Sequence, residues 1–408
     1  MAPKKTNIKI KHSKFNLYNK KKSKARQALT VILTIAAACV LGVVGYGVGK
    51  PVLDYFRNGG QYTSDSSDQP GSSDVSGVAG SDDPDGQSGS ENAGESVPES
   101  SQPDSSDVSS PVFDGSMYFL PDNAAASSAS LNSALAAAKS AGATTVVVTL
   151  KDQTGNFLYK SGITEIAGSI TGTLTAAQIS DIITKAGFNP AARISTLMDS
   201  INPSLVDGGY EHSPTSPYSG SYWLDNRTDR GGKVWFSPFK NNTATFLKRI
   251  TSELTAAGFS QIICANTRFP AFFGNDITVY LNDLPLTDNT KRLAALWSVL
   301  DAIDAASGDK AQMWIEVDSA GLIAESKLGT DAEICSNKTK LAASKIIISY
   351  AASGNAADAY KNAKEFAAKA KTELGSAETA VLIKGFSGSA LSDVQRAFKE
   401  AELTVLVQ

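Results

Sequence analysis

The sequence predicts an α/β fold in which eight parallel strands alternate with helices and close into a (β/α)₈ TIM-type barrel. From about Val112 onward, short runs rich in β-branched residues alternate with Ala-rich amphipathic runs. The strand runs are continuously apolar, which indicates that both faces are buried. An open, doubly wound sheet is the alternative. The barrel is preferred because the strands number eight and no Gly-rich nucleotide turn follows the first strand.

The predicted elements follow one another in a regular order. The strands, each with β-branched or aromatic residues, are expected at Met117–Pro121, Thr144–Leu150, Asn189–Ser195, Ser260–Asn266, Gln312–Val317, Ser344–Tyr350, Thr379–Gly385 and Leu403–Val407. The helices are expected at Ser128–Ala141, Thr175–Gly187, Thr243–Ala257, Asn289–Ala306, Ala356–Leu374 and Ala390–Ala401, with glycine as the usual terminator. A long loop, 196–240, separates the third strand from the helix that follows it.

The N-terminal part has a different composition and predicts a membrane anchor. Residues 1–27 hold ten Lys or Arg and no acid, and residues 28–49 form 22 uncharged residues, enough to span a bilayer as a helix. Because basic residues precede the span, the N-terminus is expected in the cytoplasm and the barrel, 112–408, outside the cell. Residues 50–111, rich in Ser, Asp, Gly and Pro, are expected to form a disordered extracellular linker.

A cleaved signal peptide is the main rival to this signal anchor, but the apolar run continues for ten residues beyond Cys39. Gly45 and Gly49 have the spacing of a helix-pairing motif, so a transmembrane dimer is a further possibility. The barrel region is nearly neutral, with 26 basic and 29 acidic residues from Pro111 onward. A nucleic-acid partner is therefore not expected.

The fifth predicted strand carries the clearest chemical signal. Period-two alternation places Trp314, Glu316 and Asp318 on one face, and Ile315 with Val317 on the other. A carboxylate beside an indole has a raised pKa and acts as a general acid, which glycoside cleavage requires together with a second carboxylate. Glu316 is therefore the candidate acid, with Asp318 or Asp152 as its partner. The alternative is that Glu316 forms a structural ion pair with Arg193, Arg268 or Lys384.

Other polar and aromatic residues are expected at the carboxyl ends of the strands or in the long loop, where such barrels place their working residues. The loop aromatics either stack against sugar rings or anchor the loop to the barrel. No metal-ligand cluster, P-loop or dinucleotide motif is present, so no metal or cofactor is expected. The candidate substrate-binding residues are Lys151, Arg193, Tyr222, Trp223, Asp225, Asn266, Arg268, Trp314 and Lys384.

An ordered series of motifs carries a resemblance to a known family. The motifs are LKDQTG at Leu150–Gly155, ARI at Ala192–Ile194, WLD at Trp223–Asp225 and AAGFSQI followed by ANTRFP up to Pro270. With them the chain resembles a glycoside-hydrolase-like barrel domain of unknown function found on bacterial cell surfaces. This resemblance implies a (β/α)₈ barrel and a pocket for carbohydrate.

The resemblance also implies an Asp at the end of the fourth strand, where this chain has Ala265. In retaining barrels that use a fourth-strand Asp nucleophile and a fifth-strand acid, loss of the nucleophile removes most activity. Two functions are therefore expected. The protein is either a membrane-anchored extracellular glycoside hydrolase acting on cell-wall or environmental polysaccharide, or a non-catalytic glycan-binding or structural surface barrel.

Overall fold

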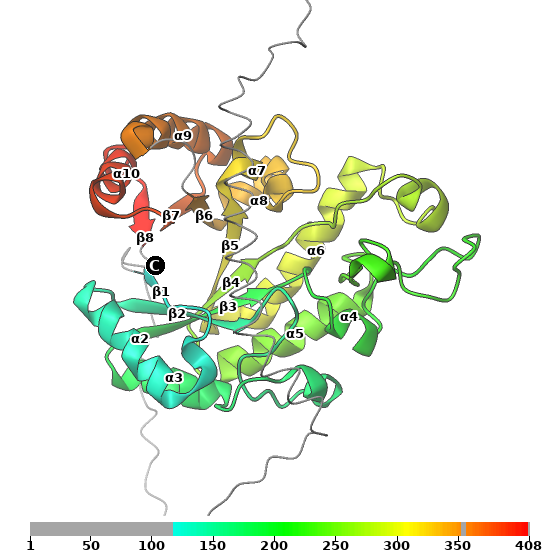
Figure 1. The fold of residues 1–408 in the computed structure, drawn as a ribbon, viewed down its shortest axis with the longest axis horizontal. Helices are drawn as coiled ribbons and strands as arrows, with labels where there is room; N and C mark the ends of the chain where they lie inside the picture. Colours follow the sequence, from blue (N-terminus) through cyan, green and yellow to red (C-terminus); the bar gives the residue numbers. More distant parts are fainter. Residues whose placement is uncertain (1–116, 352–355, 407–408) are drawn as a thin grey trace, which may run out of the picture. The chain divides into compact units, whose positions relative to one another are not determined.

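Eight parallel strands form a single sheet in sequence order, from β1 to β8, and helices surround it (Figure 1). The computed structural model describes residues 117–351 and 356–406. The expectations for the tail at 1–27, the span at 28–49 with its glycine motif, and the linker at 50–111 therefore concern residues outside the described part.

The strands pair only with their sequence neighbours, and every pairing is parallel. Their bounds are β1 Met117–Phe119, β2 Thr145–Lys151, β3 Asn189–Ser195, β4 Gln261–Ala265, β5 Gln312–Asp318, β6 Lys345–Ala351, β7 Glu378–Lys384 and β8 Thr404–Leu406. β1 and β8 approach each other, but no strand ladder joins them in the described residues. The sheet is therefore a nearly closed barrel, which confirms the predicted (β/α)₈ architecture.

The inside of the barrel is filled by apolar side chains from all eight strands. This interior cluster consists of Met117, Phe119, Val147, Ala191, Ile263, Trp314, Ile347, Ala380, Leu382 and Leu406, all nearly or fully buried. A larger outer cluster, which includes Ile315 and Val317, lies between the sheet and the helices. The two clusters follow from period-two alternation on strands that are buried on both faces.

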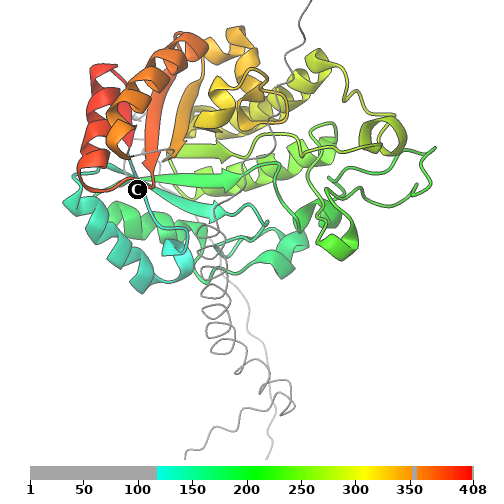
Figure 2. The same cartoon turned by 45° about the horizontal axis from the view of Figure 1, so that its top comes forward.

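The main helices are longer than the connecting turns and pack on the outside of the sheet (Figures 1 and 2). They are α2 Ser128–Ser140, α3 Ala176–Lys185, α5 Asn241–Ala256, α6 Asn289–Ser307, α9 Ala359–Leu374 and α10 Gly388–Glu400. Their termini follow local sequence signals. Thr175 and Gln178 form a capping box at the start of α3, and Gly187 and Gly258 have positive φ just after α3 and α5. None of the helices in the described part of the chain combines the length and apolar character needed to cross a bilayer.

Several short elements lie in loops that the sequence pattern left unassigned. They are α4 Asn202–Leu205, α7 Ser319–Ile323 and α8 Lys338–Ala342, together with 3₁₀ turns η1 Ala124–Ala126, η2 Thr164–Ser169, η3 Thr228–Arg230, η5 Gly308–Lys310 and η6 Asp331–Ser336, and a π-helical turn η4 Asp276–Tyr280. The predicted helix Ala356–Leu374 begins with a 3₁₀ turn, η7 Ala356–Asp358, which leads into α9. The loop after β3 is tied to the loop after β4, because the amide of Ser213 donates to the carbonyl of Tyr280 at 2.7 Å. Figure 2 shows these two loops extending from the same side of the barrel.

Candidate functional site

Glu316 on β5 is held by groups from three other strands. Arg193 of β3 donates from Nε to Oε2 at 2.5 Å and from Nη2 to Oε1 at 3.2 Å. Ser349 of β6 donates to Oε1 at 2.7 Å, and Lys384 of β7 donates to the same oxygen at 3.2 Å. The Glu316 side chain is only 7% exposed. A two-pronged guanidinium, an ammonium group and a hydroxyl therefore hold this carboxylate in one position.

These cations determine the protonation state of Glu316. Burial by itself favours the neutral acid, but the charge and hydrogen bonds of Arg193, aided by Lys384, lower the pKa of Glu316 to about 2. The sequence-based expectation that the indole of Trp314 raises this pKa is wrong, because the opposite charges outweigh the apolar neighbour. Near neutral pH, Glu316 is an ionised carboxylate and not a proton donor. Trp314 itself is fully buried inside the barrel, so its ring is not available to a ligand.

The two carboxylates expected to assist Glu316 have local structural partners. Asp318 is the N-cap of α7, and its Oδ1 accepts a hydrogen bond from the amide of Gly321 at 2.7 Å. Asp152 follows β2 and accepts from the amides of Thr154, Gly155 and Asn156 at 2.8 to 2.9 Å. Both carboxylates thus organise the first turn after a strand.

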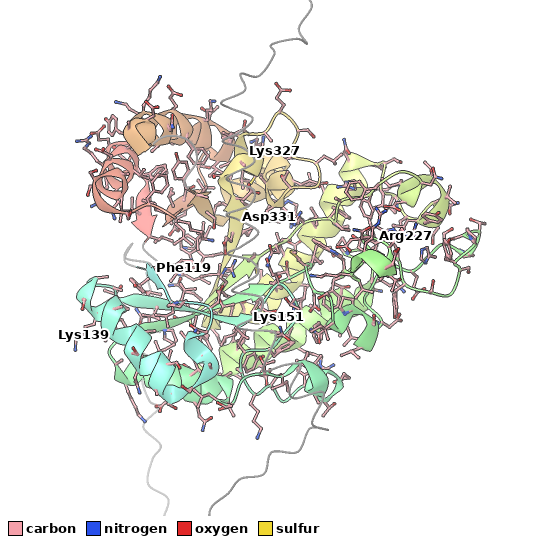
Figure 3. All side chains as sticks on the ribbon, in the orientation of Figure 1. Phe119, Lys139, Lys151, Arg227, Lys327 and Asp331 are labelled. Carbon is pink, nitrogen blue, oxygen red and sulfur yellow. The ribbon has the colours of Figure 1, made fainter. Side chains whose placement is uncertain are left out.

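Lys151 lies at the end of β2 and is fully buried (Figure 3). Its ammonium group donates to the carbonyl of Ser195 at 2.7 Å and pairs with Asp199, also fully buried, at 2.8 Å. Gly155 makes room for this pair, because a Cβ there would lie 2.1 Å from Oδ1 of Asp199. The KDQTG stretch therefore joins the loops after β2 and β3. Lys151, predicted to bind substrate, is instead inaccessible to a ligand.

The loop after β3 is anchored by its aromatic residues. Trp223 is 2% exposed and packs against Tyr210 and Phe272 at ring-centroid distances of 5.9 and 5.1 Å. The hydroxyl of Tyr222 donates to Asp207 at 3.0 Å. Trp223 is therefore not placed to stack on a sugar, and its contacts favour the anchoring alternative.

Asp225 and Arg268 are connected through the indole of Trp235. The indole Nε1 donates to Asp225 at 2.8 Å, and the Arg268 guanidinium lies over the ring at 5.2 Å from its centroid. Arg268 follows β4, so the long loop and the fourth strand meet at this point. Asn266, two residues earlier, has a φ of +56° and donates to Oγ of Ser195 at 2.9 Å. Asn is one of the few residues that tolerate this left-handed conformation.

A polar cleft of about 580 Å³ lies at the carboxyl ends of β1 to β4. Its lining includes Asp122, Thr149, Asp152, Gln153, Arg193 and Asn266. Asp122 accepts a hydrogen bond from Thr149 at 2.9 Å. A smaller hollow of about 270 Å³ shares Gln153 and Thr154 with this cleft and is also lined by Asp225 and Trp235. The structure thus brings Arg193, Asp152 and Asn266 together around one cleft, with Asp225 at the adjoining hollow.

Asp331 is an acidic residue of the barrel mouth that the sequence analysis missed (Figure 3). It is the first residue of η6, a segment that contacts β5, and its side chain is 17% exposed. Its Oδ1 lies 3.1 Å from Nε of Arg268. Its sequence signal is weak, because it is an isolated acid in the loop after the fifth strand, thirteen residues beyond Asp318.

An eight-stranded parallel barrel with charged residues and a polar cleft at the carboxyl ends of its strands places the protein in the class of (β/α)₈ barrels, whose active sites lie at that end. Within that class, residues 117–350 match the model of the family DUF4015, described as "Putative glycosyl hydrolase domain". The chain belongs to this family. No curated protein matches the sequence.

Solved structures with a similar fold share little sequence with this chain. A hypothetical protein from Ruminiclostridium thermocellum is 16% identical, with a TM-score of 0.38, over 48% of this chain and 96% of that one. The cycloalternan-forming enzyme from Listeria monocytogenes, in complex with a pentasaccharide substrate, is 13% identical, with a TM-score of 0.41, over 72% of this chain and 28% of that one. An alpha-L-fucosidase from Paenibacillus thiaminolyticus is 10% identical, with a TM-score of 0.39, over 71% and 49% respectively.

Proposed function

We propose that this protein binds a cell-wall or environmental polysaccharide in the cleft at the barrel mouth, as a membrane-anchored extracellular barrel. The observation that carries the proposal is the cleft itself. Carboxylate, amide, hydroxyl and guanidinium groups from the ends of four successive strands line one volume of about 580 Å³. Such mixed donors and acceptors match the hydroxyl groups of sugars, and membership of a glycosyl-hydrolase-type family supports the same ligand class.

The cleft supplies groups of both hydrogen-bonding types at fixed positions. Arg193 can only donate, while Asp122 and Asp152 accept when ionised. Because Glu316 holds the guanidinium of Arg193 through two hydrogen bonds, that donor is preorganised on its strand. A sugar hydroxyl that donates to one group and accepts from another fits this arrangement better than an apolar ligand does.

The experiment that tests this function is a glycan array probed with the full-length chain in detergent. Binding to one class of polysaccharide is expected, and Arg193→Gln is expected to weaken it by about tenfold or more, since a charge-assisted donor is lost. Because this change also breaks the pair with Glu316, binding is measured well below the melting temperature of the variant. Arg396→Gln, on the exposed surface of α10, is the matched control. Wild-type protein that binds no glycan would refute the proposal.

A non-catalytic barrel is the second candidate, and one observation favours it. The end of β4 carries Ala265, 1% exposed, where the family resemblance implies a carboxylate. Binding of a glycan without release of reducing ends by the wild-type protein would establish this candidate.

The membrane anchor is a proposal from residues 28–49 alone. A reporter enzyme that is active only outside the cytoplasm is expected to be active when fused after residue 408 and inactive when fused after residue 27. The reverse pattern would contradict the proposed orientation.

A further inference from the structure

Three aromatic rings meet on the surface where the loop after β3 lies beside the loop after β4 (Figure 1). His212 and Tyr218 belong to the first loop and Tyr280 to the second, and these three rings are called the aromatic platform. Their centroids are 5.5 Å apart for His212 and Tyr218, 5.8 Å for His212 and Tyr280, and 5.6 Å for Tyr218 and Tyr280. Each ring therefore contacts the other two, and the platform is a single aromatic surface.

The platform is accessible to solvent. Tyr218 is 57% exposed, and the side chains of His212 and Tyr280 are half-buried. Among the described residues, none forms a hydrogen bond with either tyrosine hydroxyl or with Nε2 of His212. Isolated exposed aromatic rings are common on proteins, whereas rings gathered at one place mark a binding surface. A ligand can therefore use both the apolar faces of these rings and their unengaged polar atoms.

Hydrogen bonds hold the platform in a fixed shape. The amide of Ser213 donates to the carbonyl of Tyr280 at 2.7 Å, which joins the two loops. Within the first loop, Nδ1 of His212 lies 3.0 Å from the carbonyl of Ser221, whose hydroxyl donates to the carbonyl of Tyr218 at 2.7 Å. Because the rings are already in place, a ligand that binds them loses little free energy in ordering the loops.

The charge of the two loops limits the class of ligand. Residues 208–222 and 271–284 contain no Lys or Arg and three acidic residues. One of these acids, Glu211, pairs with Lys240 at 2.6 Å. Nucleic acids and anionic lipid surfaces are bound by clusters of basic side chains, and these two segments supply none. The ligand that fits the platform is therefore an uncharged one.

We propose that the aromatic platform is a second carbohydrate-binding site, for the sugar rings of an uncharged polysaccharide, and this inference rests on the proposed function for its ligand class. A pyranose ring has an apolar C–H face bordered by hydroxyl groups. A tyrosine ring complements the apolar face by stacking, and its hydroxyl group, like Nε2 of His212, is available to hydrogen-bond a sugar hydroxyl. Tyr218, the most exposed of the three rings, is the expected stacking residue.

The platform and the cleft are connected through one loop. The loop 196–240 contributes His212 and Tyr218 to the platform, and Asp225 and Trp235 to the hollow that adjoins the cleft. A polysaccharide repeats its sugars many times, so one chain can occupy both sites, whereas a trisaccharide occupies one. Linked binding of this kind raises the affinity for the long chain and leaves the affinity for the short one unchanged. The platform should therefore favour polymers over short oligosaccharides.

The direct test measures the affinity of the full-length chain, in detergent, for long and short probes. The long probes are soluble α-glucan, β-glucan, xylan and galactomannan, all uncharged, and the short probes are the matching trisaccharides. Tyr218→Ala is expected to lower the affinity for the polysaccharide that the wild type binds by about 3- to 10-fold, since one aromatic contact is lost. The affinity for the matching trisaccharide should stay unchanged, because the cleft is intact.

Two further variants separate loss of the ring from other effects. Tyr218→Phe keeps the ring and is expected to retain most of the affinity for the polysaccharide. Leu328→Ala is the matched control, because it removes an apolar side chain of similar exposure, 53%, from the loop after β5. All three variants should unfold at the wild-type temperature, since the side chains are exposed. A Tyr218→Ala protein with unchanged Tm and wild-type affinity for the polysaccharide overturns the inference.

His212 gives a readout on the unaltered protein. The chain has two histidines, so in a sample with labelled histidine the ring signals of His212 are identified by their loss in His212→Gln. The bound polysaccharide is expected to shift these NMR signals, because a sugar stacked on Tyr218 changes the surroundings of the adjoining ring. A polysaccharide that saturates the wild type without moving the His212 signals overturns the inference, whatever the Tyr218 variants do.

The two binding sites fail in different ways. If Arg193→Gln weakens polysaccharide binding and Tyr218→Ala does not, the platform is refuted and the proposed function stands. If the His212 signals shift but Arg193→Gln leaves trisaccharide binding unchanged, the cleft is refuted as a binding site and the platform stands. If the wild type binds none of the four polysaccharides, the inference is overturned, and the glycan array alone decides the proposed function.

Discussion

Replacing Glu316 by Gln should destabilise the barrel by about 3 kcal/mol at pH 7. Folding lowers the pKa of this carboxylate from 4.5 to about 2, and each pKa unit corresponds to about 1.4 kcal/mol of stability. The side chain is 7% exposed, so solvent screens the interaction little. Independently, removal of one partner from a buried ion pair costs about 3–5 kcal/mol, because the other charge stays buried. The two routes agree on the magnitude.

The assay is thermal and denaturant unfolding of wild type and Glu316→Gln at several pH values. A loss of about 3 kcal/mol corresponds to a decrease in Tm of about 6 °C for a domain of this size. Because the folded-state pKa is lowered, the stabilisation is present above about pH 4.5 and is lost as pH falls towards about 2. The difference between the two proteins should therefore shrink over that interval.

The control for this prediction is Glu365→Gln, the same substitution at an exposed position on α9, which should change stability by less than about 0.5 kcal/mol. The reasoning is refuted if Glu316→Gln unfolds within about 1 kcal/mol of the wild type at pH 7. It is equally refuted if the difference between the two proteins stays constant from pH 5 to pH 3.

Three further substitutions test the supports of the loops around the cleft. Lys151→Met leaves the fully buried Asp199 without its cation and should cost about 3–5 kcal/mol in denaturant unfolding, with much of the loss recovered when Asp199→Leu is added. Gly155→Ala should lower the free energy of unfolding by at least about 1–3 kcal/mol, because φ at this position is +104° and the new Cβ would collide with Asp199. The control is Gly142→Ala, where φ is +70° but the space around the new Cβ is open, so that this change measures backbone strain alone. Trp223→Ala should cost about 3–5 kcal/mol as a core truncation, and an unchanged Tm would contradict its role as an anchor.

The barrel itself was predictable because its signals are local. Runs with β-branched or aromatic residues marked each strand, and alternation along β5 was sufficient to place Trp314 inside the barrel and Ile315 outside it. The short elements α7, α8 and η6 were missed, since they depend on caps and contacts within long loops. Their sequences lack the periodicity that identifies longer helices.

The site was only partly predictable, because its chemistry depends on distant residues. Glu316 was identified from the sequence, but its protonation state is set by Arg193, which is 123 positions earlier in the chain. The alternative role of Glu316, an ion pair with Arg193, Arg268 or Lys384, is confirmed for Arg193 and Lys384, whereas Arg268 pairs with Asp331 instead. Asp331 has no distinguishing motif. Only the folded arrangement brings it to Arg268 and Asp318.

Within residues 117–351 and 356–406 no ladder joins β1 to β8, so the barrel wall consists of a continuous arc of paired strands and a seam between β1 and β8. In that part of the chain β1 and β8 are three residues long and each is paired along one edge only, whereas the six strands between them are paired on both edges. Backbone amides at the seam should therefore exchange hydrogen with solvent before those of the arc. Slow breathing of the barrel would begin there, beside the interior residues Phe119 and Leu406. Glu316, paired with β3, β6 and β7, lies in the part of the wall that opens last.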